Sequence, residues 1–420
     1  MSNGALDPEP EAVPSLFSSL GYPGSKRYFL GLALSMVGTW MQSIALAWLV
    51  VKVLNGSGRE LGLVSIFQFG PILALGMYAG ALSDRFDKRT LMFITQFFMG
   101  SAALLLAFID FTNRESMSAV YLLSAVSGLA SAFDTPVRRA MIGDLVPKEA
   151  LPNAMSINTG VMTSTRVLGM AIGGYVVRYA GTEWCFLING ISYVAMMIAL
   201  VGLSNRRHAT LSSSTESGVL VALRVVWRLP ELRLVIIATA ITATLTFNYQ
   251  TTFPLMVKQV FHYDADSLGA LFAVTSAGTL AGAMASAKRP RPTLGWFTIG
   301  IAMMGVGAGF LSIAGSFAWG LVAAFPLGVG GGLFMAQMSG LLTSQTEPSM
   351  RGRVLALQTV VFLGSTPIGG PIVGAISDEY GARWASAVGG IAALAAAMYA
   401  WSAHRRLGTR GLHQPALLPD

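Results

Sequence analysis

The sequence predicts an all-α membrane protein with twelve transmembrane helices in two six-helix pseudo-symmetric halves. Its composition, its charge-free runs and the positions of its cations together support this fold class. Of the 420 residues, 53% are hydrophobic and 11% are charged, and the mean hydropathy is +0.60. Soluble domains carry about 25% charged residues. Lipid is therefore the expected solvent for most of the chain.

The individual spans are expected where the chain lacks Asp, Glu, Lys and Arg, because a membrane-crossing helix needs about 20 apolar residues. One run is interrupted by Arg166, and the longest, 292–346, has room for two crossings joined near Ala314, Gly315 and Ser316. The runs are 29–51, 61–83, 90–109, 116–133, 150–177, 184–205, 234–257, 267–287, 292–346, 354–377 and 384–404. Eleven runs thus predict twelve helices.

The domain boundaries follow from the longest polar stretch, which separates six predicted helices from six. We expect an N-terminal cytoplasmic tail (1–26), a first half (27–204), a cytoplasmic linker (205–232), a second half (233–404) and a C-terminal cytoplasmic tail (405–420). A shift of 201 residues places Pro147 on Pro348 and Gly169 on Gly370, as expected for duplicated halves. Within the linker, apolar residues at helical spacing around Arg224 and Arg228 predict an amphipathic surface helix.

Lys and Arg predict the orientation of the chain, because short cytoplasmic loops retain them. With the N-terminus inside, 21 of the 28 cations lie in inside segments, six lie outside, and Arg166 lies within the membrane. Both termini are therefore expected in the cytoplasm. The net charge of +8 then reports topology, and we expect no nucleic-acid partner because the cations are spread over seven short segments.

The loop after the second predicted helix reads GALSDRFDKR over residues 80–89. It resembles the major facilitator superfamily signature G-x-L-x-D-R-x-G-R-R, with Asp87 in place of the second glycine. The resemblance implies the major facilitator fold and a cytoplasmic gate at the start of the eleventh helix. The gate residues it implies are Gly80, Asp84, Arg85, Lys88, Arg89, Arg351 and Arg353. The alternative is a loop that only anchors the topology.

Further stretches are similar to one branch of that superfamily, which contains the enterobactin exporter and the macrolide efflux proteins. They lie at 134–140, 146–154, 166–169, 248–255 and 351–354, and the resemblance extends over about residues 27–404. Membership of this branch implies export without naming the cargo.

Two ionisable residues within the spans are candidates for function, since charge in a membrane is costly. Arg166 lies near the middle of the fifth helix, where it either faces the cavity as a substrate or gate contact or forms a structural ion pair. Asp134 precedes Arg138 by four residues, which places both on one helix face unless Pro136 breaks the helix. Asp134 is either a proton-coupling carboxylate or part of the cytoplasmic gate. The gate is favoured because Asp134 is shallow and two arginines follow it.

The resemblance also implies a central cavity lined by helices 1, 4, 7 and 10. Polar and aromatic candidates for contact with substrate or for coupling on these helices are Trp40, Gln42, Asn248, Tyr249, Gln250, Phe334 and Gln337. Amides among aromatic residues suit an amphipathic cargo, although helix-to-helix hydrogen bonds would use the same residue types. The first helix has no carboxylate, unlike that of several proton-driven exporters.

Glycine and proline patterns in helices 5 and 11 predict close helix packing, with bending where the halves move. The residues concerned are Gly169, Gly173, Gly174, Gly370, Gly374, Pro367 and Pro371. Tight packing without a hinge is the alternative reading.

Taken together, these features predict a secondary transporter, not an enzyme, that exports a drug or siderophore and exchanges it for protons. No pattern for a phosphate-binding loop occurs, so ATP is not expected to bind, and no cofactor is expected. The single cysteine and four histidines show no metal-ligand spacing. The expected setting is a monomer in a bacterial inner membrane. Uptake by symport, a membrane-embedded enzyme and a membrane sensor remain as alternatives.

Overall fold

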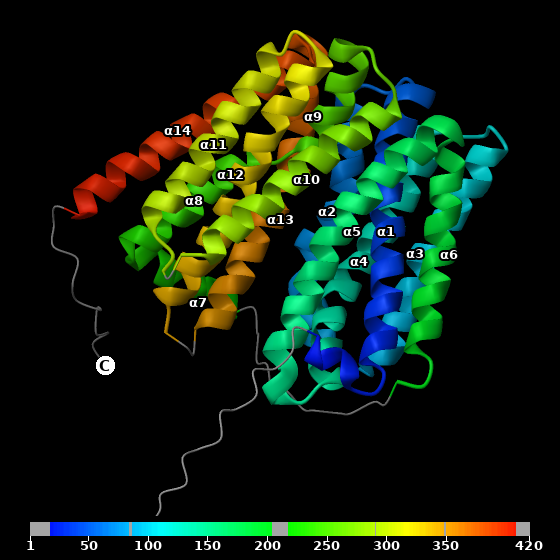
Figure 1. Ribbon diagram of the computed structural model, residues 1–420, viewed down its shortest axis with the longest axis horizontal. Helices are drawn as coiled ribbons and strands as arrows, with labels where there is room; N and C mark the ends of the chain where they lie inside the picture. The colour runs from blue at the N-terminus through cyan, green and yellow to red at the C-terminus, as the bar shows by residue number, and fades with distance from the viewer. Residues whose placement is uncertain (1–16, 84–85, 204–216, 290, 348–349, 409–420) are drawn as a thin grey trace, which may run out of the picture.

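The computed structural model describes residues 17–83, 86–203, 217–289, 291–347 and 350–408, and every regular element in these ranges is helical (Figure 1). The helices are α1 (Ser25–Trp48), α2 (Gly58–Ser83), α3 (Lys88–Phe111), α4 (Met117–Leu145), α5 (Leu151–Tyr179), α6 (Thr182–Leu200), α7 (Ser217–Arg228), α8 (Pro230–Leu245), α9 (Tyr249–Leu255), α10 (Ala265–Ala287), α11 (Leu294–Ile313), α12 (Phe317–Ser344), α13 (Arg351–Tyr380) and α14 (Ala382–Gly408). Short 3-10 turns are η1 (Ser18–Gly21) and η3 (Lys148–Ala150), and π-helical turns are η2 (Leu49–Val53) and η4 (Met256–Phe261).

Ten helical segments of the described chain are long and apolar enough to cross a membrane. One combines α1 with η2, and another combines α8, α9 and η4. Two more helices of the bundle, α2 and α5, have 26 and 29 residues but are not among these ten. The chain is therefore a multi-pass membrane protein.

Several helices begin at a side-chain cap that the sequence provides. Asp87, Ser116, Thr293 and Ser316 each accept a hydrogen bond from the backbone N–H three residues later, at the starts of α3, α4, α11 and α12. Such a cap stabilises a helix by about 1 kcal/mol. Ser316 explains why the long apolar run 292–346 divides where it does, because α11 has ended by Ile313 and α12 starts directly after this cap.

The prolines of two predicted spans have different consequences. Pro136 lies inside α4 and does not end it, so Asp134 and Arg138 do share a helix face. The predicted span 234–257, in contrast, is interrupted between Leu245 and Tyr249 and continues as α9 and η4. The interruption places irregular backbone inside the bundle, where neighbouring protein must satisfy its polar groups.

The helices pack into two groups. The first helical group consists of α1–α6, and the second helical group consists of α8–α14. Figure 1 shows the first group on the right and the second on the left. The helices α2 and α5 of the first group face α10 and α13 of the second. The main contacts between the groups are α2 with α13 and α5 with α10.

These contacts lie toward one end of the bundle. We call it the Asp378 end, where α2 and α10 begin and α5 and α13 finish, and we call the opposite end, where α3 and α5 begin, the Lys88 end. In α2, a Cβ added to Gly62 would lie 2.6 Å from the Cα of Pro371 in α13. A Cβ on Gly76, further along α2, would meet nothing within 4 Å, and the same holds for Gly160 in α5. The two groups therefore touch at the Asp378 end and part toward the Lys88 end.

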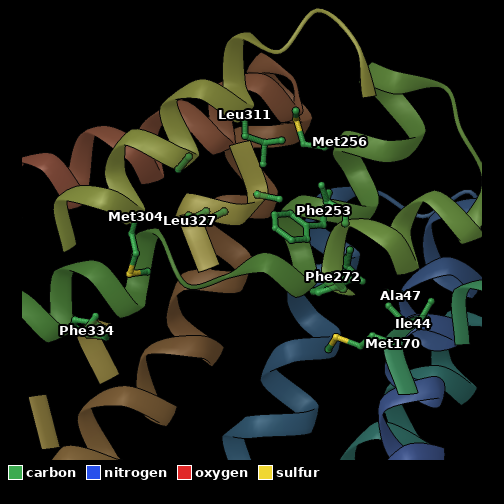
Figure 2. Packing of buried hydrophobic residues seen from close by; sticks show 14 of the residues in the cluster. Ile44, Ala47, Met170, Phe253, Met256, Phe272, Met304, Leu311, Leu327 and Phe334 are labelled. Atoms are coloured by element: carbon green, nitrogen blue, oxygen red, sulfur yellow. The ribbon is translucent and has the colours of Figure 1, made fainter. Parts of the chain in front are cut away.

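The apolar core follows the same division. One cluster joins both groups and includes Ile44 and Met170 of the first with Phe253 and Phe272 of the second. Figure 2 shows Phe253 and Phe272 together, with ring centroids 5.0 Å apart, near Met170. A second cluster around Tyr28 contains residues of the first group and its flanking segments alone.

The helix α7 lies in the stretch for which an amphipathic linker helix is expected. Ala222 and Val226 are fully buried one turn apart, whereas Trp227 is 52% exposed. The helix packs on α8 and α13 with this buried edge. It is attached to the second helical group rather than suspended between the groups.

Candidate functional site

A polar stripe on α5 faces the second helical group. Close to the Asp378 end, Met170 and Gly174 of α5 approach Gly269 of α10, and a Cβ on Gly174 would lie 2.7 Å from the Gly269 Cα. With about 100° of rotation per residue, four of the polar residues toward the Lys88 end, namely Arg166 and three others within about 80° of it, fall on this same face. The α5 polar stripe consists of Ser156, Thr159, Thr163 and Arg166.

The α5 polar stripe lies where the two groups have parted. Ser156 and Thr159 are exposed, and Thr163 and Arg166 are partly exposed. Each hydroxyl of the stripe donates a hydrogen bond to the carbonyl four residues earlier, at 2.9–3.0 Å. The stripe is therefore a polar surface that leads from the Lys88 end to Arg166.

Arg166 lies in the stripe with unused hydrogen-bonding capacity. Its Nε is buried without a hydrogen-bond partner, and the described residues provide no ion-pair partner for its guanidinium. The guanidinium lies over the ring of Trp40 in α1, 6.0 Å from the ring centroid. Trp40 can come this close because Gly169 has no side chain, and a Cβ there would lie 2.7 Å from the Trp40 Cβ. Of the two readings of Arg166, the structural ion pair has no partner in the described chain.

Tyr249 of α9 completes this cluster from the second group. Its hydroxyl is buried without a hydrogen-bond partner and is close enough to Arg166 for electrostatic interaction. Its ring stacks on Phe253 at 5.1 Å with an interplanar angle of 14°. The indole Nε1 of Trp40 is also buried and unpartnered. Arg166, Trp40 and Tyr249 form what we call the donor cluster.

The interrupted backbone before α9 is held by Asn248. Its Nδ2 donates to the carbonyl oxygens of Ala243 (3.3 Å) and Thr244 (2.6 Å), and its Oδ1 is buried and unpartnered. Asn248 is 3% exposed, so its first role is to close the break in the helix. Gln250 is partly exposed and has no hydrogen bond to the described residues.

Three other predicted cavity residues lie in helix packing. The Oε1 of Gln42 accepts a hydrogen bond from Asn189 Nδ2 of α6 at 2.7 Å. Gln337 is 2% exposed, accepts a hydrogen bond from the Thr293 N–H and donates one to Ser286, each at 2.8 Å. Phe334 is fully buried, with its ring 5.5 Å from that of Phe297. These contacts agree with the alternative of helix-to-helix hydrogen bonds and packing, and contact of the three residues with cargo stays a prediction.

Asp134 is fixed within the first helical group. It is 2% exposed, pairs with Arg138 at 3.1 Å, and accepts hydrogen bonds from Gln96 (2.8 Å) and Thr95 (3.2 Å) of α3. The Nη1 of Arg138 also lies 3.2 Å from the sulfur of Met36 in α1. This pair ties α1, α3 and α4 together and contacts no described residue of the second group.

The predicted gate at the Lys88 end is only partly within the described residues. Asp84 and Arg85 lie outside them, as does the side-chain environment of Gly80. Lys88 pairs with Asp144 at 2.8 Å inside the first group, and Arg89 donates to the Leu203 carbonyl at 3.4 Å.

On the second group, the two arginines predicted for this gate stay close to their own helix start. Arg351 donates to the Thr346 carbonyl at 3.3 Å, and Arg353 lies 3.4 Å from the sulfur of Met350. In the described part of the chain, none of these four basic residues bridges the two groups. This agrees with their separation at the Lys88 end.

At the Asp378 end, in contrast, polar contacts join α2 to α13, and sequence analysis did not single them out. The carboxylate of Asp378 accepts hydrogen bonds from the backbone N–H groups of Gly58 (2.6 Å) and Arg59 (2.9 Å). An aspartate of the second group thereby caps the first turn of a helix in the first group. Arg59 also pairs with Glu379 at 2.7 Å.

The α5–α10 contact carries a matching ion pair, again with the arginine in the first group and the carboxylate in the second. Arg178 near the end of α5 binds Asp264, at the start of α10, and lies 3.6 Å from Asp266. Lys258 of η4 donates to the Val51 carbonyl of η2. The sequence contained one indication of these contacts. The loops that it predicts on the outer side carry both cations and carboxylates, which can pair with each other.

Among the glycines singled out, Gly169 and Gly173 of α5 pack on α1 within the first group, whereas Gly174, Gly370 and Gly374 lie at contacts between the groups. Gly173 approaches Met41 of α1, and a Cβ there would lie 2.8 Å from the Met41 Cα. Gly370 and Gly374 meet Ser65 and Gly58 of α2, Pro371 meets Gly62, and Pro367 is buried. Helix backbones thus approach each other directly at the Asp378 end, which only small residues permit.

A separate acidic pocket lies inside the first group at the Asp378 end. Asp110 is 7% exposed and accepts a hydrogen bond from the Thr182 hydroxyl. With Glu115 and Glu183 it lines a pocket of about 320 Å³. Because no residue of the second group lines this pocket, it does not connect the two groups.

The arrangement as a whole has one closed end, one parted end and a donor cluster between the two groups. A molecule entering from the Lys88 end would pass the α5 polar stripe before it reached Arg166. Beyond Arg166, the glycine-mediated helix contacts and the ion pairs of the Asp378 end hold the two groups together. Such geometry suits binding and movement of a solute rather than a chemical reaction.

Comparison with known proteins identifies related sequences and folds. The family model described as "Major Facilitator Superfamily" matches residues 28–364. The Staphyloferrin A transporter of Staphylococcus aureus is 26% identical over 295 residues, which are 67% of this chain and 73% of that protein. The multidrug efflux pump Tap of Mycobacterium tuberculosis is 23% identical over 367 residues (83% and 85%). The enterobactin exporter EntS of Salmonella typhi is 22% identical over 374 residues (84% and 86%).

Solved structures with very different sequences share the fold. A bacterial homologue of the human lysosomal transporter Spinster, solved in an inward-facing and unoccupied conformation, matches with a TM-score of 0.70 at 16% identity and covers 95% of this chain and 99% of its own. The nucleoside transporter NupG matches with a TM-score of 0.71 at 10% identity, covering 91% and 99%.

Proposed function

Because the chain belongs to the Major Facilitator Superfamily, and is thus a transporter rather than an enzyme, we propose that it exports a small amphipathic organic molecule by alternating access. Two relatives of similar length are named as exporters, one of enterobactin and one of multiple drugs. We place the cargo of this chain in the same classes, drugs or siderophores. The separation of the two helical groups at one end only is the observation that carries this proposal.

The proposed topology has twelve spans, with α2 and α5 added to the ten apolar segments, in two halves that correspond to the first and second helical groups. The helix α7 lies in the linker between them. Both termini and the Lys88 end are cytoplasmic, and the Asp378 end faces outward, because 21 of 28 cations belong to the inside segments. The membrane is the bacterial inner membrane.

In this proposal the conformation described above opens toward the cytoplasm and is ready to load cargo. Export then requires the Asp378 end to open and the Lys88 end to close. The first change breaks the Asp378 cap and the Arg178–Asp264 pair. In the second, Asp84 and Arg85 close on the second half near Arg351 and Arg353.

The proton gradient is the proposed energy source, since the sequence contains no phosphate-binding loop for ATP. Asp134 is the candidate coupling residue, and its alternative role is in the gate. Its hydrogen bonds to Thr95 and Gln96 and its pair with Arg138 would rearrange if it took up a proton. Asp134→Asn separates the two roles, because loss of coupling removes the response of efflux to ΔpH, whereas a gate defect slows efflux and leaves that response in place.

The experiment that tests the function is an efflux panel of fluorescent drugs and ferric chelators in cells that express the chain. Energised export predicts that cargo accumulates less than in control cells and that a protonophore abolishes the difference. Inverted vesicles then give the direction, because an exporter concentrates cargo inside them. Net loss of cargo from energised inverted vesicles would contradict export and favour uptake.

A further inference from the structure

The donor cluster combines a permanent positive charge with unused donors. Arginine keeps its charge in proteins and offers five N–H donors in a planar fork. Arg166 carries this charge in the middle of α5, and the described residues supply neither an ion pair nor a hydrogen bond to it. An unpaired charge within a membrane span is costly, so we expect a site that retains one to bind a counter-charge at some stage.

The neighbouring groups add donors of the same kind. The Trp40 indole offers one N–H and no acceptor, and the Tyr249 hydroxyl offers one O–H; both atoms are buried and unpartnered. Next to Tyr249 in the chain, Asn248 has a buried and unpartnered acceptor, its Oδ1. Trp40 lies against the Arg166 guanidinium, and Tyr249 is within electrostatic range of it. Unpartnered donors from three helices therefore lie in one region, which favours an acceptor-only, negatively charged group.

No carboxylate of the described protein is available to fill that position. Asp134 is committed to Arg138 and to two side chains of α3. Asp264 and Asp378 are committed at the Asp378 end. The α5 polar stripe, in contrast, leaves Arg166 accessible from the parted end.

The shape of the site favours a planar anion with an apolar body. A guanidinium fork matches a carboxylate in two parallel hydrogen bonds. The Tyr249 ring is itself in contact with the rings of Phe247 and Phe253, at centroid distances of 5.0 and 5.1 Å. A carboxylate-bearing molecule with aromatic or aliphatic surface would satisfy both parts.

We propose that Arg166, Trp40 and Tyr249 form a seat for the carboxylate of the exported molecule, so that the cargo is an amphipathic organic anion. This assignment rests on the proposed export function and narrows its substrate class. Arg166 binds the anion, Trp40 and Tyr249 orient it, and the stripe gives it a polar path from the cytoplasmic side.

Binding to the purified full-length protein in nanodiscs tests the seat. The probes are anthracene-9-carboxylate and its methyl ester, which keeps the ring system and lacks the charge, and calorimetry measures affinity. Wild type should prefer the carboxylate. Arg166→Gln should weaken carboxylate binding about 10- to 100-fold, because it removes charge-assisted hydrogen bonds, and should leave ester binding unchanged.

Conservative variants refine the test without disturbing the fold. Arg166→Lys keeps the charge without the planar fork of donors, and its affinity for the carboxylate should lie between those of wild type and Arg166→Gln. Trp40→Phe and Tyr249→Phe each remove one donor and keep an aromatic ring. Each should lower the affinity for the carboxylate about 2- to 10-fold. Arg114→Gln, in an exposed loop between α3 and α4, is the matched control and should bind as wild type does.

The outcomes separate this inference from the export proposal. If Arg166→Gln weakens both probes equally, or keeps the preference for the carboxylate, the seat is refuted and Arg166 is structural. If the protein exports neutral drugs but does not prefer the carboxylate, the seat is refuted while export stands. If cells show no energised efflux although the carboxylate preference depends on Arg166, export is refuted and the seat stands as a binding site.

Discussion

The close approach of α5 and α10 predicts that adding one methyl group shifts the conformational equilibrium. A Cβ on Gly174 would lie 2.7 Å from both the Gly269 Cα and the Ala265 carbonyl oxygen, against 3.4 Å for ordinary contact. The helices must then part by about 0.7 Å, which costs about 1–3 kcal/mol when a packed site is overfilled. The added methyl group raises the free energy only of the conformation that is closed at the Asp378 end. Gly174→Ala should therefore raise the population open at that end about 5- to 150-fold.

Labelling of a single cysteine measures this shift. The native Cys185 is buried and is replaced by Ala, and Ser65→Cys introduces a thiol in α2 that is buried against Gly370. A membrane-impermeant maleimide added from outside reaches this thiol only when the Asp378 end opens. The labelling rate should rise with the open population.

A glycine far from this contact controls for the general effect of Gly→Ala in a helix, which stabilises by about 0.5–1 kcal/mol. A Cβ on Gly309 in α11 would meet nothing within 4 Å. Gly309→Ala should label at the wild-type rate. If Gly174→Ala also labels at that rate, or both variants label faster by the same factor, the steric reasoning is refuted.

Three further predictions concern single side chains. Asp378→Ala removes the cap on α2, which is worth about 1 kcal/mol, and should raise the labelling rate of the Ser65→Cys thiol about fivefold. Glu379→Gln disrupts only an exposed ion pair and should change this rate little. Equal effects of the two substitutions would contradict the capping role. Asp134→Ala leaves Arg138 charged and unpaired in a buried site, so the free energy of unfolding should fall by about 3–5 kcal/mol. An unchanged thermal midpoint in detergent would show that the Asp134–Arg138 pair does not stabilise the fold. Gln337→Leu should lower the thermal midpoint and leave efflux per folded molecule unchanged; a changed cargo preference would return this residue to the cavity.

Much of the fold follows from local rules that the sequence carries. Apolar runs predict the spans because lipid forces each backbone to satisfy its own hydrogen bonds, and Ser316 divides the longest run by capping a helix. Arg166 and Asp134 are recognisable as exceptional because charge within a span is costly whatever it contacts. The helical spacing of Asp134 and Arg138 also predicts their ion pair once α4 continues through Pro136.

Other features depend on which helices become neighbours, and periodicity does not contain that information. Gln42 and Gln337 look like cavity residues along the chain, but each meets a hydrogen-bond partner on another helix. Asp378 and Gly58 are 320 positions apart, so only the packing of α2 on α13 makes one cap the other.

The sequence by itself therefore predicts the solvent, the apolar spans and the two unusual charges, because each depends on the energy of a residue in lipid or in its own helix. Its motifs carry the family resemblance. The tertiary structure alone decides that the groups meet at the Asp378 end, that Asp134 is also held by Thr95 and Gln96 of α3, and that Arg166 has no ion-pair partner among the described residues. The physical reason is that pairing is a property of two surfaces. The energetic cost of a charge within a span can be judged from the sequence. The residue that pairs with it is known only once the packing of the helices is known.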